Sequence, residues 1–337
     1  MADSISFDES KTTDSLEEET DIYAEQGDSR PTPRSRVCAF LKQHSSYDVL
    51  PVSYRIIVLD TSLLVKKALT ALMQNGIVSA PLWDSIRQKF AGMLTVSDFL
   101  NLIQYYYERS SYSAALEEIE QCQIQQFREI ERKIGLPPPQ MLSIHPLKSL
   151  YEACKLLVEA RAHRLPLVDV DSDTGQEMIV SVLTQYRILK FIAVNCTEIK
   201  LLRKPLSEIK IGVYENLATA RLSTTVIDVI SMFVEKRISS VPILDEHGVV
   251  INVYETVDVM TLIRSGAYYG LNLPVGEAML KRTEDFPGVH TCTLNDNLHS
   301  IFDLIRAKPV YRLVVVDSEK KLKGIVSLSD IMRYLVT

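Results

Sequence analysis

A four-fold internal repeat limits what this 337-residue chain can fold into more than any other feature. Each copy places apolar residues at positions i, i+3, i+4 and i+7, which is the spacing of one stripe along an α-helix. The stripes are Val65, Ala68, Leu69 and Leu72; Leu150, Ala153, Cys154 and Leu157; Val226, Val229, Ile230 and Phe233; and Leu298, Ile301, Phe302 and Ile305. The pattern indicates one supersecondary unit used four times, whose copies bury their apolar faces against one another.

A second apolar run begins nine residues after the last stripe position of every copy. These runs begin at Pro81, Pro166, Pro242 and Val314. They predict short buried strands, and proline fits as a first strand residue because no ladder hydrogen bond is needed from its nitrogen. Another β-rich run and another helix follow, so we expect a helix-strand-strand-helix unit of about 60 residues in each copy.

The junction between the second strand and the second helix reads GMLTVSDFL, SVLTQYRIL, NVYETVDVM and GIVSLSDIM in the four copies. One position of this junction holds Asp98, Arg187, Asp258 and Asp330. A carboxylate in the first turn of a helix can accept two hydrogen bonds from a vicinal diol, such as the 2′- and 3′-hydroxyls of ribose. Helix capping explains the same residues equally well from their spacing alone.

Cationic side chains recur just before the first strands. They are His163 and Arg164 in copy two, Arg237 in copy three and Arg312 in copy four. Solvated surface charge would explain any one of them, but an anion such as phosphate needs donors of this kind near a helix N-terminus. The recurrence therefore keeps a phosphate-binding role open beside the capping role.

Four units with these junctions resemble the cystathionine-β-synthase (CBS) domain. The stretches YDVLPVSYRIIVLDTSLLVKKAL, SAPLWDS, FAGMLTVSDF, HRLPLVD, LTQYRILKF and GIVSLSDI together resemble the gamma regulatory subunits of AMP-activated protein kinase in their fungal form. The resemblance covers residues 45–336. It implies an α/β fold in which four CBS repeats form two pseudo-twofold pairs and a flat disc, with nucleotide phosphates directed into a shared central channel.

The domain boundaries expected on this basis cover the whole chain. They are an acidic disordered tail at 1–36, CBS repeat one at 37–109, a helical linker at 110–139, and CBS repeats two, three and four at 140–198, 199–268 and 269–337. The tail is predicted because ten of the first thirty residues are Asp or Glu. Such a segment buries too little apolar surface to offset the entropy lost on ordering.

The resemblance also implies the site residues and the ligands. Ribose would bind at Asp98, Asp258 and Asp330, whereas Arg187 would leave its position empty. The other residues that it implies for nucleotide binding are His163, Arg164 and Arg312 facing phosphate, and Thr95, Ser239, Ser327 and Ser329 as hydroxyl-bearing residues. The implied ligands are AMP, ADP or ATP, with no cofactor and no metal.

Four positions depart from the animal members of the family. Val78 stands where they carry Arg, Tyr186 where they carry Lys, Tyr311 where they carry His, and Val213 where they carry Thr. Each exchange removes a phosphate donor or a polar contact, and one charge-assisted hydrogen bond contributes about 1.5 to 3 kcal/mol, or about ten-fold to over a hundred-fold in affinity. We therefore expect fewer and weaker sites than three aspartates would permit.

The predicted function is a non-catalytic, energy-sensing regulatory subunit of a heterotrimeric Ser/Thr protein kinase. Its partners would be a catalytic alpha subunit, a scaffolding beta subunit and adenine nucleotide. The alternative is a scaffold subunit of the same complex whose nucleotide sites are vestigial. An enzyme is not expected, because the chain has no GxSxG, GxxxxGK[ST], GxGxxG or HExxH motif.

Net charge, hydropathy and cysteine content exclude further classes of protein. A net charge of −6 gives no global reason to expect binding to nucleic acid or to an anionic membrane. No apolar run reaches the roughly 18 residues of a membrane span, which predicts an intracellular protein. The expected locations are the cytoplasm and the nucleus. The five cysteines are far apart and show no zinc-ligand spacing, which predicts buried, reduced thiols.

Overall fold

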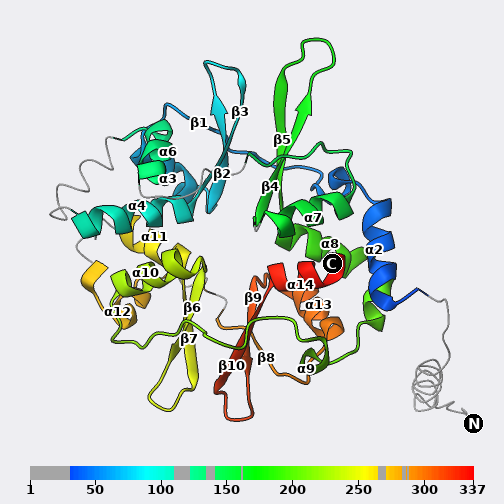
Figure 1. The fold of residues 1–337 in the computed structure, drawn as a ribbon, viewed down its shortest axis with the longest axis vertical. Helices are drawn as coiled ribbons and strands as arrows, with labels where there is room; N and C mark the ends of the chain where they lie inside the picture. The colour runs from blue at the N-terminus through cyan, green and yellow to red at the C-terminus, as the bar shows by residue number, and fades with distance from the viewer. Residues whose placement is uncertain are drawn as a thin grey trace, which may run out of the picture.

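The computed structural model describes residues 31–109, 122–133, 141–160, 162–264, 271–282, 286 and 288–337. Four helix-strand-strand-helix repeats lie around a common centre (Figure 1). Their elements are α3 (Val65–Gln74), β2 (Ser79–Asp84), β3 (Lys89–Thr95) and α4 (Val96–Arg109); α7 (Leu150–Glu159), β4 (Arg164–Val170), β5 (Glu177–Thr184) and α8 (Gln185–Asn195); α10 (Val226–Lys236), β6 (Ser240–Leu244), β7 (Val250–Glu255) and α11 (Thr256–Arg264); and α13 (Leu298–Ala307), β9 (Arg312–Val316), β10 (Leu322–Ser327) and α14 (Leu328–Val336). The repeat predicted from apolar spacing is confirmed.

Further elements precede or connect the repeats. They are α2 (Pro33–Gln43), η2 (Ser46–Val49), β1 (Leu59–Asp60), α6 (Ile124–Lys133), η3 (Thr197–Leu201), α9 (Leu206–Ile209), α12 (Val275–Met279) and β8 (Thr291–Cys292). Helix α6 lies within the expected helical linker, whose residues 110–121 and 134–139 are outside the described residues. None of the helices that the structure describes is long and apolar enough to cross a membrane.

Local sequence signals set the helix ends. Ser149 forms a capping box with Glu152 at the start of α7, where each side chain accepts the backbone N–H of the other residue. Asn297 accepts the Ser300 N–H at the start of α13. Helix α3 ends at Gln74 with Asn75 as its C-cap, and Gly76 follows with a φ of +62°, a conformation that glycine adopts without a steric penalty.

Each repeat forms an antiparallel hairpin with a fixed register. The first residue of the first strand pairs with the last residue of the second strand. The four pairs are Ser79 with Thr95, Arg164 with Thr184, Ser240 with Glu255, and Arg312 with Ser327. Strands β1 and β8 add to the hairpins of repeats one and four in parallel. Because the second helix starts at once, every hairpin brings a strand start beside a helix start.

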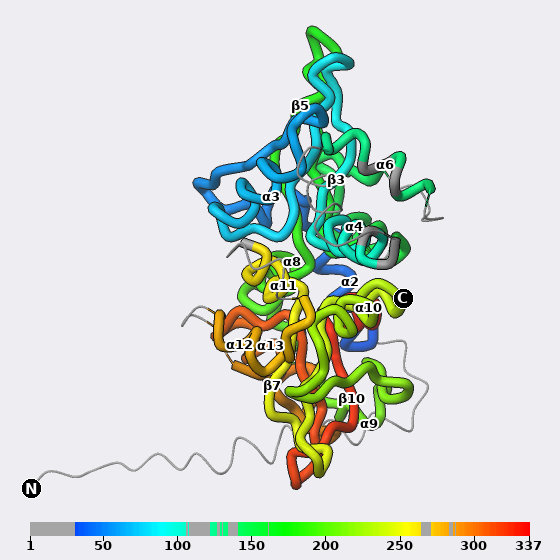
Figure 2. Tube along the Cα trace, turned by 90° about the vertical axis from the view of Figure 1, so that its left-hand side faces the viewer, coloured from blue at the N-terminus to red at the C-terminus, as the bar shows by residue number. Residues whose placement is uncertain are grey.

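The repeats share their apolar cores in pairs. Repeats one and three form one core, where α4 packs against α10, and repeats two and four form another, where α8 packs against α13. Figure 1 shows the first pair at the left and the second at the right. In the edge view of Figure 2, repeats one and two lie above repeats three and four. The predicted disc of two pairs is confirmed.

The N-terminal boundary differs from the expected one. Helix α2 begins at Pro33, so residues 33–36 of the expected tail are helical, whereas residues 1–30 lie outside the described residues. Thr32 caps this helix, and Val37 and Leu41 are fully buried against repeats two and four. The apolar anchors hold the segment even though an acidic stretch precedes it.

All five cysteines are free thiols, as predicted. Four of them are buried, and Cys38 is partly exposed. Burial raises the pKa of Cys292 to about 12, and burial also raises the pKa of Cys196 to about 12. These thiols therefore stay protonated, and they behave as small apolar core residues.

Candidate functional site

The hairpins of the four repeats begin near the middle of the disc (Figure 1). Repeats two and four start their first strands with arginine, at Arg164 and Arg312, whereas repeats one and three start theirs with buried serines, Ser79 and Ser240. The register pairs each of these residues with the residue that precedes the second helix. In repeat four the register therefore places a predicted cation, Arg312, beside the start of the helix that carries Asp330.

Repeats two and four meet at a polar cluster of three side chains. Ser329 donates its hydroxyl to Gln185 Oε1 at 3.0 Å. His163 Nδ1 lies 3.4 Å from Gln185 Oε1 and 3.4 Å from Ser329 Oγ. Gln185 is buried and donates its amide to the Ala162 carbonyl at 2.9 Å. Two predicted residues, His163 and Ser329, are thus brought together by a glutamine that the sequence reasoning missed.

Positive charge surrounds His163. The protein packed around this side chain lowers the pKa of its imidazole, and Arg164 and Arg312 lower that pKa further. His163 still keeps solvent-exposed surface. An imidazole with a lowered pKa is neutral at pH 7, so one ring nitrogen can donate and the other can accept a hydrogen bond.

The two strand-start arginines have different surroundings. Arg312 forms an ion pair with Glu255 and donates to Ser239 Oγ at 3.2 Å. Arg164 is partly buried, and its guanidinium makes no ion pair within the described part of the chain. Desolvation lowers the pKa of Arg164, but guanidinium remains charged at neutral pH. A desolvated cation with no acidic partner is a suitable place for an anion.

Two of the aspartates are held by the residue three positions before them, which is the last residue of the second strand. Asp98 Oδ2 accepts the Thr95 N–H at 2.7 Å and the Thr95 hydroxyl at 3.2 Å. Asp330 Oδ2 accepts the Ser327 N–H at 2.9 Å and the Ser327 hydroxyl at 2.6 Å. These are capping contacts, so the capping interpretation holds for both residues. At Asp330 they use one carboxylate oxygen, and the other remains 3.5 Å from Arg333.

The aspartate of repeat three is held differently. Glu255 stands where the other repeats have Thr95, Thr184 and Ser327, and its backbone N–H donates to Asp258 Oδ2 at 2.6 Å. Arg282, from the segment after α12, donates to Asp258 Oδ1 at 2.7 Å through Nε and to Asp258 Oδ2 at 2.5 Å through Nη2. Both oxygens of this carboxylate are therefore occupied by arginine.

Repeat two has no carboxylate at the junction. Thr184 Oγ1 accepts the Arg187 N–H at 3.1 Å, and the Arg187 guanidinium donates to the Val182 carbonyl at 3.2 Å. This arrangement gives a ribose diol no acceptor from the side chain at that position. The neighbouring Tyr186 packs against Tyr311, with ring centroids 5.3 Å apart.

Three residues at the centre were not predicted: Gln185, Glu255 and Arg282. Two of them carried a sequence signal. Gln185 places a polar amide at the first position of α8, where repeats one and four have the apolar Val96 and Leu328, and Glu255 replaces a hydroxyl residue. Arg282 lies outside the repeated unit, so no comparison between copies could have found it.

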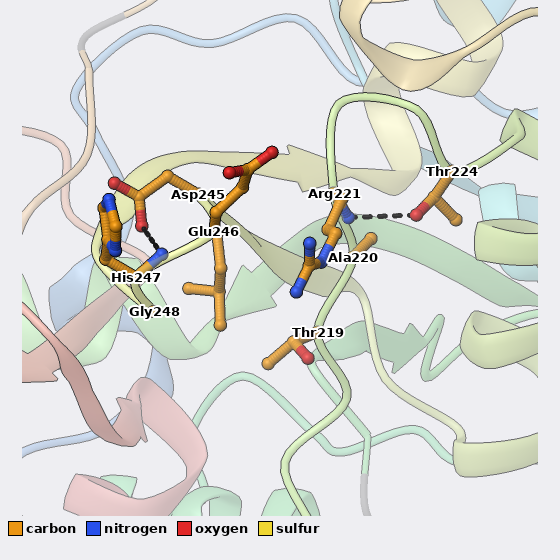
Figure 3. A pocket seen from close by; sticks show the side chains of 9 residues that line it. Thr219, Ala220, Arg221, Thr224, Asp245, Glu246, His247 and Gly248 are labelled. Carbon is orange, nitrogen blue, oxygen red and sulfur yellow. Dashed lines mark hydrogen bonds between the residues drawn. The ribbon is translucent and has the colours of Figure 1, made fainter.

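A pocket of about 540 Å³ lies elsewhere, at the turn between β6 and β7 (Figure 3). Its lining includes Arg221, Thr224, Asp245 and His247. Short local bonds hold it, with the His247 N–H donating to Asp245 at 2.9 Å and the Arg221 N–H to Thr224 at 2.9 Å. None of the predicted site residues lines this pocket. The described residues also contain no group of His, Cys, Asp or Glu arranged to hold a metal ion.

The comparisons with known proteins agree with this architecture. A model of the CBS domain matches residues 133–194, 208–265 and 282–337. The structure superimposes with a TM-score of 0.68 on an archaeal protein from Methanocaldococcus jannaschii described as a homologue of g-AMPK, covering 86% of this chain and 99% of that one at 15% identity. The repeats and their junctions thus define a CBS-domain protein.

Proteins of similar sequence identify the family within the CBS-domain proteins. The chain is 53% identical to the 5′-AMP-activated protein kinase subunit gamma of Kluyveromyces lactis, over 88% of this chain and 90% of that one. It is 51% identical to the subunit of the same name from Saccharomyces cerevisiae, over 88% of this chain and 91% of that one. The chain belongs to the family of 5′-AMP-activated protein kinase gamma subunits.

Proposed function

We propose that this protein is a non-catalytic regulatory subunit of a heterotrimeric Ser/Thr protein kinase and that it binds AMP, ADP or ATP at the centre of the disc. The observation that carries the proposal is the convergence of Arg164, Arg312, His163 and Ser329 beside the junction of Asp330. These side chains come from two repeats that share one core. Membership in the gamma-subunit family supports the same function.

The ribose and the phosphates of a nucleotide have candidate partners at this centre. The ribose diol binds the Asp330 oxygen that Ser327 leaves unused, and Asp98 is the corresponding carboxylate of repeat one. The phosphates bind the strand-start arginines, assisted by hydroxyl groups of Ser239 and Ser329. Guanidinium suits this role because its fixed donors match phosphate oxygens in pairs.

Regulation requires that the nucleotide bind two states of the kinase with different affinity. The proposed partners are a catalytic alpha subunit and a scaffolding beta subunit, and the proposed location is the cytoplasm and the nucleus. The scaffold alternative with vestigial sites is not favoured, because Arg164 keeps its charge while having no acidic partner in the described chain. Mass spectrometry of a complex purified through this chain tests the partners, and absence of a kinase subunit would contradict them.

Calorimetric titration with AMP, ADP and ATP tests nucleotide binding directly. Asp330→Ala and Arg164→Ala should each weaken binding at least about ten-fold, the minimum expected for one charge-assisted bond. Arg221→Ala is the matched control, because this arginine lines the outer pocket of Figure 3 and should leave binding unchanged. No saturable binding up to millimolar nucleotide, with protein shown to be folded, would refute the proposal. An equal loss in Arg221→Ala would refute the central location.

A further inference from the structure

Arg282 is locked into repeat three by every nitrogen of its guanidinium. Besides the two bonds to Asp258, Nη1 donates to Asn252 Oδ1 at 2.9 Å and Nη2 donates to the Val253 carbonyl. The guanidinium also lies 4.1 Å from the ring centroid of Phe286, a distance suited to a cation–π contact. The side chains of Arg282 and Asp258 are only 10% and 9% exposed. This is a buried, bidentate pair in which each of the three guanidinium nitrogens donates at least one hydrogen bond.

Repeat four provides the contrast, because it also has an arginine beside its aspartate. Arg333 Nη1 stays 3.5 Å from Asp330 Oδ1, and its side chain is 50% exposed. An exposed ion pair at this distance contributes little to the stability of the protein and breaks readily. The Asp330 carboxylate therefore remains available to an external donor, whereas the Asp258 carboxylate does not.

The sequence of repeat three explains why Asp258 has an arginine. The hydroxyl that donates to the aspartate in repeats one and four is replaced by the carboxylate of Glu255. A carboxylate cannot donate, and two acids one helical turn apart repel each other. Arg312 pairs with Glu255 and Arg282 pairs with Asp258, so each acid has its own cation.

We infer that Arg282 is a specificity-determining residue that closes the repeat-three position to ribose by acting as the internal ligand of Asp258. A ribose diol needs the carboxylate oxygens that Nε and Nη2 hold. It binds only in the fraction of molecules in which Arg282 has left, and its apparent affinity falls by that fraction. The inference rests on the proposed function, since it decides which of the three acidic positions accept nucleotide.

Equilibrium dialysis of the full chain with AMP counts the sites. Arg282→Ala should bind one more AMP per chain than the wild type, and adding Asp258→Asn to that variant should remove the extra site. Asp258→Asn alone should leave the wild-type number unchanged. Arg333→Ala is the matched control, because it removes the arginine beside Asp330 and should add no site. Replacing AMP by 2′-deoxy-AMP should weaken the new site at least about ten-fold, since one of the two diol bonds is lost.

Two results would overturn the inference. One is an unchanged number of sites in folded Arg282→Ala. The other is the loss of one site in Asp258→Asn alone, a nearly isosteric change that decides the question even if Arg282→Ala fails to fold. A wild type that binds no AMP would refute the proposed function, and the inference would still be decided. In that case a site gained in Arg282→Ala would support the inference about Arg282, and the absence of a gained site would overturn that inference.

Discussion

Glu255→Gln should strengthen nucleotide binding, although it removes an ion pair from the protein. Glu255 holds Arg312, one of the arginines proposed to bind phosphate, and the two side chains are 26% and 17% exposed. A phosphate must compete with this carboxylate for the guanidinium and must also approach its negative charge. Glutamine has nearly the same shape and removes both obstacles.

The size of the effect follows from the bond that is exchanged. A hydrogen bond to a charged group contributes about 1.5 to 3 kcal/mol and a neutral one about 0.5 to 1.5 kcal/mol. The hydrogen bond from Arg312 to glutamine still has one charged partner, so the exchange removes only the ion-pair part of the contact, about 1 kcal/mol for a partly exposed pair, or about five-fold in nucleotide affinity. ATP should gain more than AMP, because it carries more negative charge toward the position of the lost carboxylate.

Calorimetry of the wild type and Glu255→Gln with AMP and ATP measures this gain. The pH dependence gives a second readout, because burial raises the pKa of Glu255 and Asp258 adds to that rise, while Arg312 and Arg282 oppose it. As the pH falls through this raised pKa, Glu255 becomes neutral, so the wild-type affinity should approach that of the variant. The ratio of the two affinities cancels the titration of the phosphate itself. Unchanged or weaker binding by a folded variant would show that Glu255 does not compete with the ligand.

Three further changes test the fold. Phe302→Ala should lower the free energy of unfolding by about 3 to 5 kcal/mol in urea titrations, because Phe302 is fully buried between repeats two and four; a loss below 1 kcal/mol would contradict this. Ser149→Ala should lower the free energy of unfolding by about 1 kcal/mol because it removes the α7 cap. Ser149→Asp should keep most of that stability, because aspartate is also a favourable N-cap residue. Gly324→Ala should cost about 1 to 3 kcal/mol and lower the melting temperature, because its Cβ would clash with the Tyr214 ring; an unchanged melting temperature would contradict the packing.

The sequence predicts the repeated unit well, because the two apolar periods are local. The stripe from Val65 to Leu72 lies in α3 and the run from Pro81 lies in β2, and the other copies follow the same rule. The first strands begin two residues before the predicted starts, so the prolines are third strand residues and not first ones. The sequence does not predict in the same way which repeats share a core. Repeats one and three pair through α4 and α10, which are separated by more than 100 residues, and no local period encodes that choice.

The expected tail shows how composition can mislead at a boundary. The acidic first thirty residues suggested a tail up to residue 36, although Thr32 followed by Pro33 is a helix-start signal. The candidate site, too, could be predicted only in part from the sequence. His163, Ser329, Arg312 and Ser239 could be named from the repeats and their resemblance, but the Arg282 contact with Asp258 depends on how the segment after α12 returns to repeat three.

The shared centre follows from the register of one hairpin used four times. In each repeat the strand-start residue is fixed beside the helix-start residue, so closing four copies into a disc brings together eight positions whose side chains set the local charge. Arginines from repeats two and four and the acid Glu255 from repeat three then share the same region. A phosphate bound at Arg312, as proposed, would therefore alter the contact between repeats three and four, while a ribose bound at Asp330 would lie within the core pair of repeats two and four. One nucleotide bound in this way would couple the two halves of the disc, and this coupling is what a regulatory subunit needs in order to convert ligand binding into a change of contact with a partner.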